Sequence, residues 1–259
     1  MIRALLFDVD GTLAETERDG HLVAFNRAFA DLGVPWRWSA ARYGELLKVT
    51  GGRERLLFDM QAQREAPAGA AARAALAARL HGLKNEHYAR IVEAGGLALR
   101  PGVGELIEDC AANHVAVAVV TTTSRSNVEA LLGRHFGPQW RARFAALVCA
   151  ADAPRKKPDP EAYHVALRQL RLGAPDCLAI EDSPAGLAAA RAAGIGVIVT
   201  RSHYFPDTCG PGTLAVGDAL GEPAAWDPPA APGAARIDLA QLARWHSAIN
   251  APVASACHG

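Results

Sequence analysis

The sequence predicts an α/β protein in which a doubly wound parallel sheet carries an inserted helical cap. The chain opens with an uninterrupted apolar run at residues 4–7, which suits a strand buried on both faces. A long stretch without a convincing strand follows, from residue 14 to about residue 97. From Val103 onward, apolar runs alternate with helical patterns, as in the βαβ units of a parallel sheet.

The stretch after the first strand is predicted to be all helical. Leu22, Phe25 and Phe29 recur at helical spacing up to Gly33. Further helices are expected over residues 43–48, 54–63 and 70–93. A single short strand has no partner inside such an insert, so it must join the strands that come later. We therefore expect a cap domain of residues 14–97 inserted into a core of residues 1–13 and 98–259.

The second part of the chain supplies the remaining strands of the predicted sheet. Its apolar runs lie at residues 115–120, 145–149, 178–180 and 195–199. Residues 221–235 are rich in Pro, Ala and Gly and predict a loose connection. A last helix is expected over residues 238–249, and residues 251–259 are expected to fray.

Composition excludes several classes of partner. The 259 residues include 27 basic and 27 acidic side chains, so no global field attracts nucleic acid or an anionic membrane. The five cysteines are scattered, which argues against a disulfide framework and zinc and predicts reduced thiols. No signal-type or membrane-spanning apolar segment is present, so we expect a cytoplasmic protein, and we expect it to be a monomer.

Two carboxylates follow the first apolar run. Asp8 and Asp10 lie where the predicted strand ends, and Gly11 permits a sharp turn there. A hairpin turn is one alternative interpretation. A calcium-binding loop is another, but Thr12 and Leu13 do not supply its next ligand and glycine. In an open parallel sheet, ligands bind outside the carboxyl ends of the strands, where both acids are expected.

Three further polar motifs follow later apolar runs in a fixed order. They are Thr121 with Thr122, then Lys157, then Glu181 with Asp182. Each has an ordinary structural explanation: a helix N-cap, a solvated lysine and a helix start. Together, however, they place hydroxyl, ammonium and carboxylate groups around one sheet edge. Phosphoryl transfer needs such a set, with a divalent cation on oxygen ligands and fixed positive charge.

These four motifs resemble those of the haloacid dehalogenase superfamily over nearly the whole chain. The resemblance implies a Rossmann-like core with a helical cap. Residues 14–17 and 48–55, with the order of the motifs, resemble more narrowly the CbbY-type sugar-bisphosphate phosphatases associated with the Calvin cycle.

The resemblance implies a role for each acidic residue. Asp8 is expected to attack phosphorus and become an aspartyl phosphate. Asp10 is expected to protonate the leaving oxygen and then to deprotonate the attacking water. A Mg²⁺ cofactor is expected on Asp8, the backbone carbonyl of Asp10 and Asp182, with Glu181 orienting its waters.

The resemblance also assigns the groups that bind the transferred phosphoryl group. Thr121 is expected to hydrogen-bond it, and Thr122 can share this role. Lys157 is expected to offset its charge and to restrain Asp8.

A second phosphate is expected to bind the cap. Gly51 and Gly52 let the backbone approach a ligand, and Arg53 can grip a phosphate with two hydrogen bonds. Lys48 would add positive charge. The alternative is a helix start with a solvated arginine.

Three residues just beyond the catalytic loop are candidates for contacts with sugar hydroxyls. They are Glu15, Glu17 and His21. His21 departs from the family pattern, because one extra residue separates it from Glu17.

The leading hypothesis is a Mg²⁺-dependent phosphatase acting on a phosphorylated sugar. The resemblance suggests xylulose-1,5-bisphosphate, an inhibitor of Rubisco. A phosphosugar mutase of the β-phosphoglucomutase type, or a general sugar-phosphate or phosphoglycolate phosphatase, would use the same residues. A phospho-acceptor signalling module is a different class, which Asp10 and the large cap disfavour. A true dehalogenase needs neither the second acid nor a metal.

Overall fold

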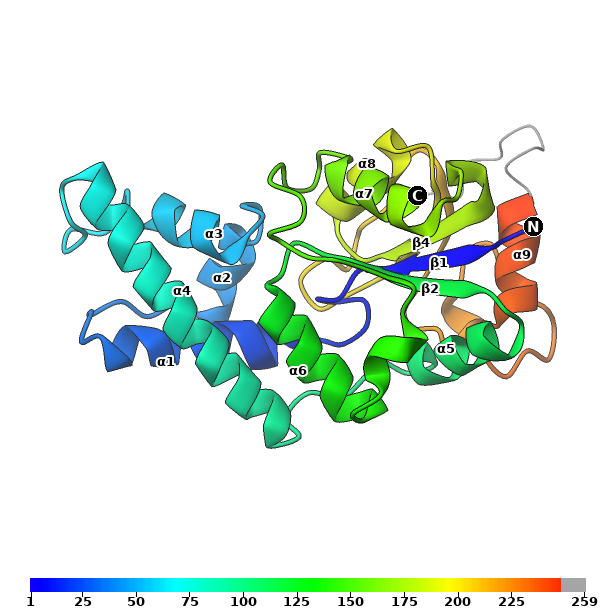
Figure 1. The fold of residues 1–259 in the computed structure, drawn as a ribbon, viewed down its shortest axis with the longest axis horizontal. Coiled ribbons are helices and arrows are strands. Elements are labelled where there is room, and N and C mark those ends of the chain that lie inside the picture. The colour runs from blue at the N-terminus through cyan, green and yellow to red at the C-terminus, as the bar shows by residue number, and fades with distance from the viewer. Residues whose placement is uncertain (248–259) are drawn as a thin grey trace.

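A computed structural model describes residues 1–247, and within them one parallel sheet forms the centre of the fold (Figure 1). The strands are β1 (Ala4–Phe7), β2 (Ala116–Val120), β3 (Ala146–Val148), β4 (Cys177–Glu181), β5 (Gly196–Thr200) and β6 (Thr213–Gly217). Their spatial order is β3-β2-β1-β4-β5-β6, and every neighbouring pair is parallel. The predicted doubly wound parallel sheet is confirmed.

Helices cover both faces of this sheet. They are α5 (Val103–Ala112), α6 (Arg125–Phe136), α7 (Glu161–Leu170), α8 (Pro184–Ala192) and α9 (Leu239–Ser247), with short 3₁₀ turns at Trp140–Arg143, Ala174–Asp176 and Pro223–Ala225. In Figure 1, α7 and α8 lie above the strands, whereas α5 and α6 lie below them. Side chains of a strand alternate between the two faces. Leu5 and Phe7 accordingly pack with α5, α6 and α9, while Ala4 and Leu6 pack with α7 and α8.

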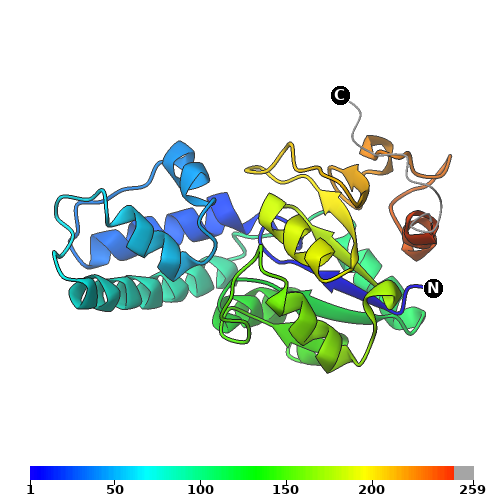
Figure 2. The same ribbon diagram turned by 90° about the horizontal axis from the view of Figure 1, so that it is seen from above.

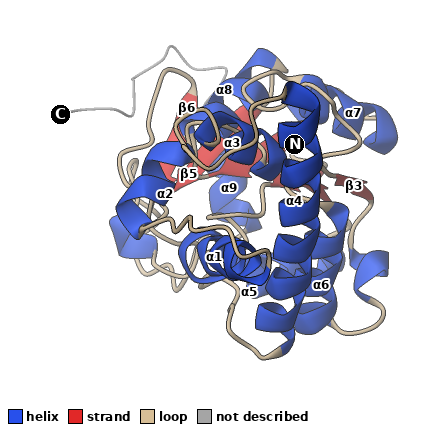
Figure 3. Ribbon diagram, turned by 90° about the vertical axis from the view of Figure 1, so that its left-hand side faces the viewer, coloured by secondary structure: helices blue, strands red, loops and turns tan. Residues whose placement is uncertain are grey.

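Residues between β1 and α5 are helical, as predicted. A π-helical stretch, Glu17–Leu22, leads into α1 (Val23–Asp31), followed by α2 (Ala40–Leu46), α3 (Gly52–Asp59) and α4 (Ala70–Glu93). These helices lie together beyond one end of the sheet (Figures 2 and 3). They share a core in which Phe25, Phe29 and Trp38 are buried. We propose on this basis that residues 14–97 act as a cap domain.

The cap and the sheet are joined by two adjacent segments of chain. Ala14 and Leu99 form an antiparallel bridge, and the amide of Arg100 donates to the carbonyl of Leu13 over 2.8 Å. The Arg100 guanidinium donates to the backbone carbonyls of Gly11 and Asp218. The connection therefore ties the first catalytic loop to a loop after β6.

The sequence analysis missed one strand, and it placed some helix boundaries too far toward the C-terminus. Strand β6 lies at the sheet edge, where it pairs with β5 alone among the strands of residues 1–247. Its apolar run, at residues 214–216, is short and was not identified as a strand. Helix α2 begins before the predicted residue 43 because the Ser39 hydroxyl accepts a hydrogen bond from the Arg42 amide. Positions 248–249 of the last predicted helix, and the predicted frayed end 251–259, fall outside the described residues.

Cysteine chemistry differs from expectation at one position. Cys110, Cys149 and Cys177 are buried free thiols, as predicted. Cys209 is disulfide-bonded, so the prediction of reduced cysteines is wrong there. The scattered spacing carried no signal for this bond. Among residues 1–247, no helix is long and apolar enough to cross a membrane.

Substituting Gly102 should destabilise the fold more than substituting a glycine in open space. Gly102 has φ +84, and a Cβ there would lie 2.4 Å from the backbone nitrogen of Gly221. We expect Gly102→Ala to lower the free energy of unfolding by about 2–4 kcal/mol, from left-handed strain plus overpacking. Gly33→Ala is the matched control, because Gly33 has φ +63 and nothing within 4 Å of its added Cβ. Urea unfolding measures both, and equal losses would contradict the packing argument.

Candidate active site

The carboxyl ends of three adjacent strands bring the predicted core motifs together. Strand β1 lies between β2 and β4, so Asp8, Thr121 and Asp182 follow neighbouring strands. From β1 the strands β2 and β3 extend the sheet to one side, whereas β4, β5 and β6 extend it to the other. Open α/β sheets bind ligands at such a topological switch point. All three side chains are buried. The sheet topology therefore makes one site out of motifs that lie far apart in the sequence.

Lys157 is the cation of this site. Its ammonium group donates to Oδ1 of Asp8 over 2.7 Å, to Oε1 of Glu181 over 2.6 Å and to the carbonyl of Val120 over 2.7 Å. Burial alone would lower the pKa of Lys157, but the two carboxylates outweigh it and raise the pKa above its usual value. The Tyr163 hydroxyl also donates to Oε1 of Glu181. All three protons of the ammonium group are thus used.

The carboxylates outnumber this one cation. Asp8, Glu181 and Asp182 offer oxygen atoms that lie within 4.8 Å of one another. Burial and the charges of Glu181 and Asp10 raise the pKa of Asp8 to about 8, although Lys157 opposes them. Burial and the charge of Asp8 raise the pKa of Asp182 well above its usual value. In the cation-free site, Asp8 and Asp182 therefore tend to hold protons, because Lys157 alone does not offset the charge of the ionised carboxylates.

The donor atoms of this cluster suit a hard divalent cation. All of them are carboxylate oxygens, the ligands that magnesium and calcium prefer. Oε2 of Glu181 is buried and has no hydrogen-bond partner in the described part of the chain. A Cβ at Gly11 would lie 2.0 Å from Oδ2 of Asp182, so only glycine lets the catalytic loop approach that carboxylate. The cluster could hold a metal ion.

Asp10 is held apart from this cluster by residues at the start of the cap. Its Oδ1 accepts a hydrogen bond from the Thr16 hydroxyl and lies 2.8 Å from Nε2 of His21. The His21 ring stacks on Tyr88, with 4.4 Å between ring centroids. Burial would raise the pKa of Asp10, but His21 outweighs it, and the pKa falls to about 2. Asp10 is therefore ionised at neutral pH in this arrangement.

Two neighbouring cavities with shared lining residues lie at these groups. The catalytic pocket, of about 280 Å³, is lined by Asp8, Asp10, Lys157 and Asp182 among others. The cap pocket, of about 290 Å³, lies beside it. Four residues line both pockets: Asp10, Glu17, Arg55 and Thr122. A ligand could therefore reach from the carboxylates into the cap.

The structure brings most predicted cap residues to these pockets. Glu17 lines both, and Lys48 lines the catalytic pocket. Four others line the cap pocket: His21, Gly51, Gly52 and Arg53. Lys48 and Arg53, which we expect to supply positive charge for one phosphate, line different pockets.

Three predicted residues lie outside both linings: Glu15, Thr121 and Glu181, whose carboxylate contacts Lys157 and Tyr163 instead. Glu15 pairs with Arg100 at 3.5 Å and accepts a hydrogen bond from the amide of His203. The Thr121 hydroxyl accepts a hydrogen bond from the amide of Thr123 over 3.2 Å. Thr122 lines both pockets, so among the described residues it is better placed than Thr121 to meet a ligand.

Sequence reasoning missed five ionisable residues of the cap pocket: Glu54, Arg55, His81, Lys84 and Lys156. Arg55 and Lys84 are 6% and 3% exposed, and His81 lines the same pocket. The Lys84 ammonium lies 5.3 Å from the ring centroids of Phe25 and Tyr88. Burial lowers the pKa of Lys84 to about 8 and, together with Lys84, that of His81 to about 4. In the sequence, Lys84 looks like a solvated lysine of an alanine-rich helix, so no local signal marks it.

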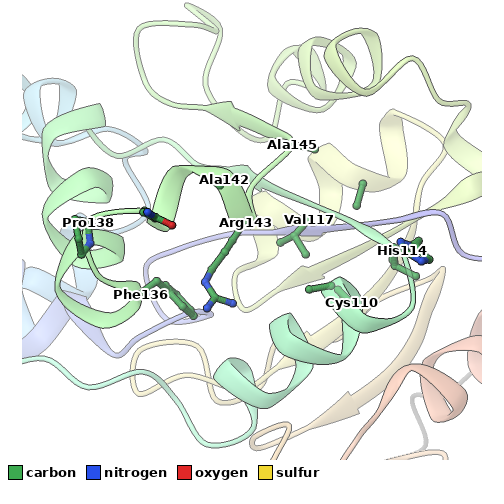
Figure 4. A pocket seen from close by; sticks show the side chains of 12 residues that line it. Cys110, His114, Val117, Phe136, Pro138, Ala142, Arg143 and Ala145 are labelled. Carbon is green, nitrogen blue, oxygen red and sulfur yellow. The ribbon is translucent and has the colours of Figure 1, made fainter.

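A larger cavity, of about 820 Å³, lies elsewhere on the molecule (Figure 4). It is lined by side chains such as Cys110, His114, Phe136 and Arg143. None of the predicted site residues lines it. The chemistry therefore belongs to the two smaller pockets.

Comparisons with known proteins agree with this geometry. The model of the haloacid dehalogenase-like hydrolase family matches residues 2–194. The chain is 47% identical to the plasmid-encoded protein CbbY of Cupriavidus necator, over 95% of this chain and 97% of that protein. It is 40% identical to a CBBY-like protein of Arabidopsis thaliana, over 85% of this chain and 70% of that protein.

Solved structures show the same similarity. A CbbY variant from Rhodobacter sphaeroides in complex with xylulose-1,5-bisphosphate superposes with a TM-score of 0.79 and 40% identity, over 85% of this chain and 97% of that chain. A β-phosphoglucomutase from Clostridium difficile, at 20% identity and a TM-score of 0.66, shares the fold.

We expect the cation-free protein to lose stability as the pH rises. The pKa of Asp8 is about 8 in the folded protein, against an ordinary value of 3.8. At a pH between these two values, the folded protein keeps a proton that the unfolded chain releases. This contribution is lost as the pH rises through the folded pKa. A saturating divalent cation should remove the dependence, because it stabilises ionised Asp8.

The measurement is urea unfolding with a chelator, from about pH 5 to about pH 8, for the wild type and Asp8→Asn. The variant controls for all other titrating groups. If the wild type instead gains stability relative to the variant as the pH rises, the argument fails.

Proposed function

The chain belongs to the haloacid dehalogenase-like hydrolases, and from that premise we propose that it is a Mg²⁺-dependent phosphatase of xylulose-1,5-bisphosphate. One observation carries the proposal: the pocket lined by the buried carboxylates and Lys157 shares four lining residues with a second pocket that carries several cationic side chains. The solved relative that holds this bisphosphate supports the choice of sugar. The resemblance to the superfamily and to its CbbY members is confirmed. A cytoplasmic location and a monomeric state remain predictions.

Asp8 is the proposed nucleophile. Its carboxylate attacks phosphorus, the bond between phosphorus and the sugar oxygen breaks, and an aspartyl phosphate forms. Lys157 holds Oδ1 of Asp8 and fixes the orientation of the carboxylate before substrate arrives. The ammonium group and the hydroxyl of Thr122 would also offset charge on the phosphoryl oxygens.

Asp10 is the proposed acid and base. It protonates the departing sugar oxygen, then accepts a proton from the water that attacks the aspartyl phosphate and releases inorganic phosphate. Thr16 and His21 hold only Oδ1, so Oδ2 is left for this transfer. An anionic phosphoryl group beside Asp10 would raise its pKa from the low value of the free enzyme and favour the protonated acid.

Mg²⁺ is the proposed cofactor. Asp8, Asp182 and the backbone carbonyl of Asp10 would hold it, and Oε2 of Glu181 is free to orient a water beside it. When bound, the ion supplies positive charge to the transferred phosphoryl group. The role of Glu181 thus extends beyond the expected one, because the same carboxylate also holds Lys157 and Tyr163.

The second phosphate is proposed to bind the cap pocket. Arg53 and Lys84 line it from the cap, and Lys156 lines it from the core. Among the described residues, the buried Lys84 ammonium makes no ion pair, and Asp10 and Glu17 attract it only from beyond ion-pair distance. A buried charge without a partner is costly, so a phosphate there would offset that cost. A sugar bisphosphate would then fill both pockets at once.

Replacing the nucleophile should abolish turnover without unfolding the chain. Asp8→Asn keeps the size of the side chain, and we expect the release of inorganic phosphate from sugar bisphosphates to fall by several powers of ten. The matched control is Asp207→Asn, at an exposed aspartate. The assay uses the purified enzyme with Mg²⁺ and a panel of sugar mono- and bisphosphates. Substantial phosphatase activity in Asp8→Asn would contradict the assignment of Asp8 as the nucleophile.

Removing a cap cation should affect bisphosphates selectively. We expect Arg53→Ala to lose about 2 kcal/mol of transition-state stabilisation on xylulose-1,5-bisphosphate, the size of a hydrogen bond to a charged group. The loss on the matching monophosphate should be much smaller. Arg64→Ala removes an exposed arginine of the cap and serves as the control. Equal losses on both substrates would instead place Arg53 in cap folding.

A further inference from the structure

A buried hydrogen-bonded group lies where the two pockets meet. The hydroxyl of Tyr43, a residue with 0% exposure, donates to Oε2 of Glu17. The same hydroxyl accepts from Nη1 of Arg55 over 2.8 Å. Glu17 and Arg55 line both the catalytic pocket and the cap pocket, whereas Tyr43 lies behind them. One hydroxyl therefore links an anionic and a cationic side chain that both face a ligand.

The chemistry of Tyr43 suits this linking position. Burial and the charge of Glu17 keep the pKa of its hydroxyl well above the usual value, although Arg55 opposes them. The hydroxyl stays neutral, so it can donate to the carboxylate and accept from the guanidinium at the same time. Phenylalanine would keep the ring and lose both bonds.

Arg55 and Glu17 each keep part of their hydrogen-bonding capacity for a ligand. Nε of Arg55 donates to the carbonyl of Leu46 over 3.2 Å, and the guanidinium carbon lies 5.0 Å from the Tyr43 ring centroid. Within residues 1–247, Nη2 of Arg55 and Oε1 of Glu17 make no hydrogen bond to another side chain or to the backbone. The two residues thus present one free donor, Nη2 of Arg55, and one free acceptor, Oε1 of Glu17. Their other atoms, Nη1 of Arg55 and Oε2 of Glu17, lie 4.0 Å apart.

We propose that Tyr43 is a positioning residue that holds Glu17 and Arg55 as a paired acceptor and donor for the sugar part of the substrate. The pair lies between the carboxylates that would handle the transferred phosphoryl group and the cations that would hold the second phosphate. If a sugar bisphosphate fills both pockets, its hydroxyl groups would lie between the two phosphates, beside Glu17 and Arg55. The inference rests on the proposed function and extends it, because it assigns the choice between sugar stereoisomers to this pair.

A fixed donor and acceptor discriminate more strongly than mobile ones. A site built to hydrogen-bond a hydroxyl rejects an isomer that leaves its polar groups unpaired. This penalty requires that the side chains cannot turn away to find water. Tyr43 supplies that restraint, because its two bonds fix one end of each partner.

The test compares wild type and Tyr43→Phe on three substrates with Mg²⁺. These are xylulose-1,5-bisphosphate, its stereoisomer ribulose-1,5-bisphosphate, and para-nitrophenyl phosphate, which has no sugar. We expect the variant to lose about tenfold or more of the wild-type ratio of kcat/KM between the two bisphosphates, the equivalent of one charged hydrogen bond. Activity on the aryl phosphate should change by less than about threefold, because it lacks the groups that the pair reads.

The control is Tyr204→Phe. The Tyr204 ring packs edge-on against Tyr43, with 5.8 Å between centroids, and its buried hydroxyl has no hydrogen-bond partner among the described residues. This change removes a neighbouring hydroxyl from the same aromatic group, and the bisphosphate ratio should stay at the wild-type value. Thermal unfolding of both variants shows whether either has lost its fold.

A double-mutant cycle with Glu17→Gln separates positioning from simple stabilisation. If Tyr43 acts through Glu17, the loss of discrimination in the double variant should be smaller than the product of the two single losses. Glu17→Gln alone should already reduce the bisphosphate ratio, which keeps the test available if Tyr43→Phe folds poorly. A wild-type ratio in Glu17→Gln, or multiplicative losses in the cycle, would overturn the inference. A wild type inactive on both bisphosphates would overturn the proposed function and the inference with it.

Discussion

The ion-paired ammonium of Lys157 is the interaction on which the rest of the site depends. It joins Asp8 after β1, Glu181 at the end of β4 and the carbonyl of Val120 at the end of β2. Without it, buried carboxylates would face one another with no cation from the protein. Removing one partner of a buried ion pair typically costs about 3–5 kcal/mol. The lysine therefore holds three strand ends in one arrangement, and a metal ion would offset the remaining carboxylates once they ionise.

The same lysine also meets the cap. The Thr50 hydroxyl donates to the backbone carbonyl of Lys157 over 2.6 Å. On another side, the amide of Asn85 in α4 donates to Ser124, and Asn127 of α6 donates to Asn85. These bonds join the cap to the core beside the two pockets. Binding energy from a distant part of a substrate can drive closure of a cap and exclude bulk water.

The sequence predicted those features that depend on local pattern or on sheet topology. The run at β1 and the long helix α4 were found with the observed bounds, because one is continuously apolar and the other is a long stretch of strong helix formers. Asp8, Lys157 and Asp182 meet because parallel strands end at one edge. Arg55 and Lys84 were missed, because their burial arises from tertiary packing of the cap. A residue's own spacing does not report which helix will cover it.

The formal net charge of the chain is zero, but charged side chains are unevenly distributed within the site, and this distribution bears on the proposed substrate. The core side of the site carries the carboxylates of Asp8, Glu181 and Asp182, whereas the cap pocket carries Arg53, Arg55 and Lys84 beside the acidic residues Glu17 and Glu54. A monophosphate with a bound cation would neutralise only the first side. A bisphosphate would place its transferred group beside the cation and its second phosphate among the cap cations, so each charge would meet its opposite. Local charge separation of this kind favours a ligand with two anionic ends over one, and it does so without any long-range field.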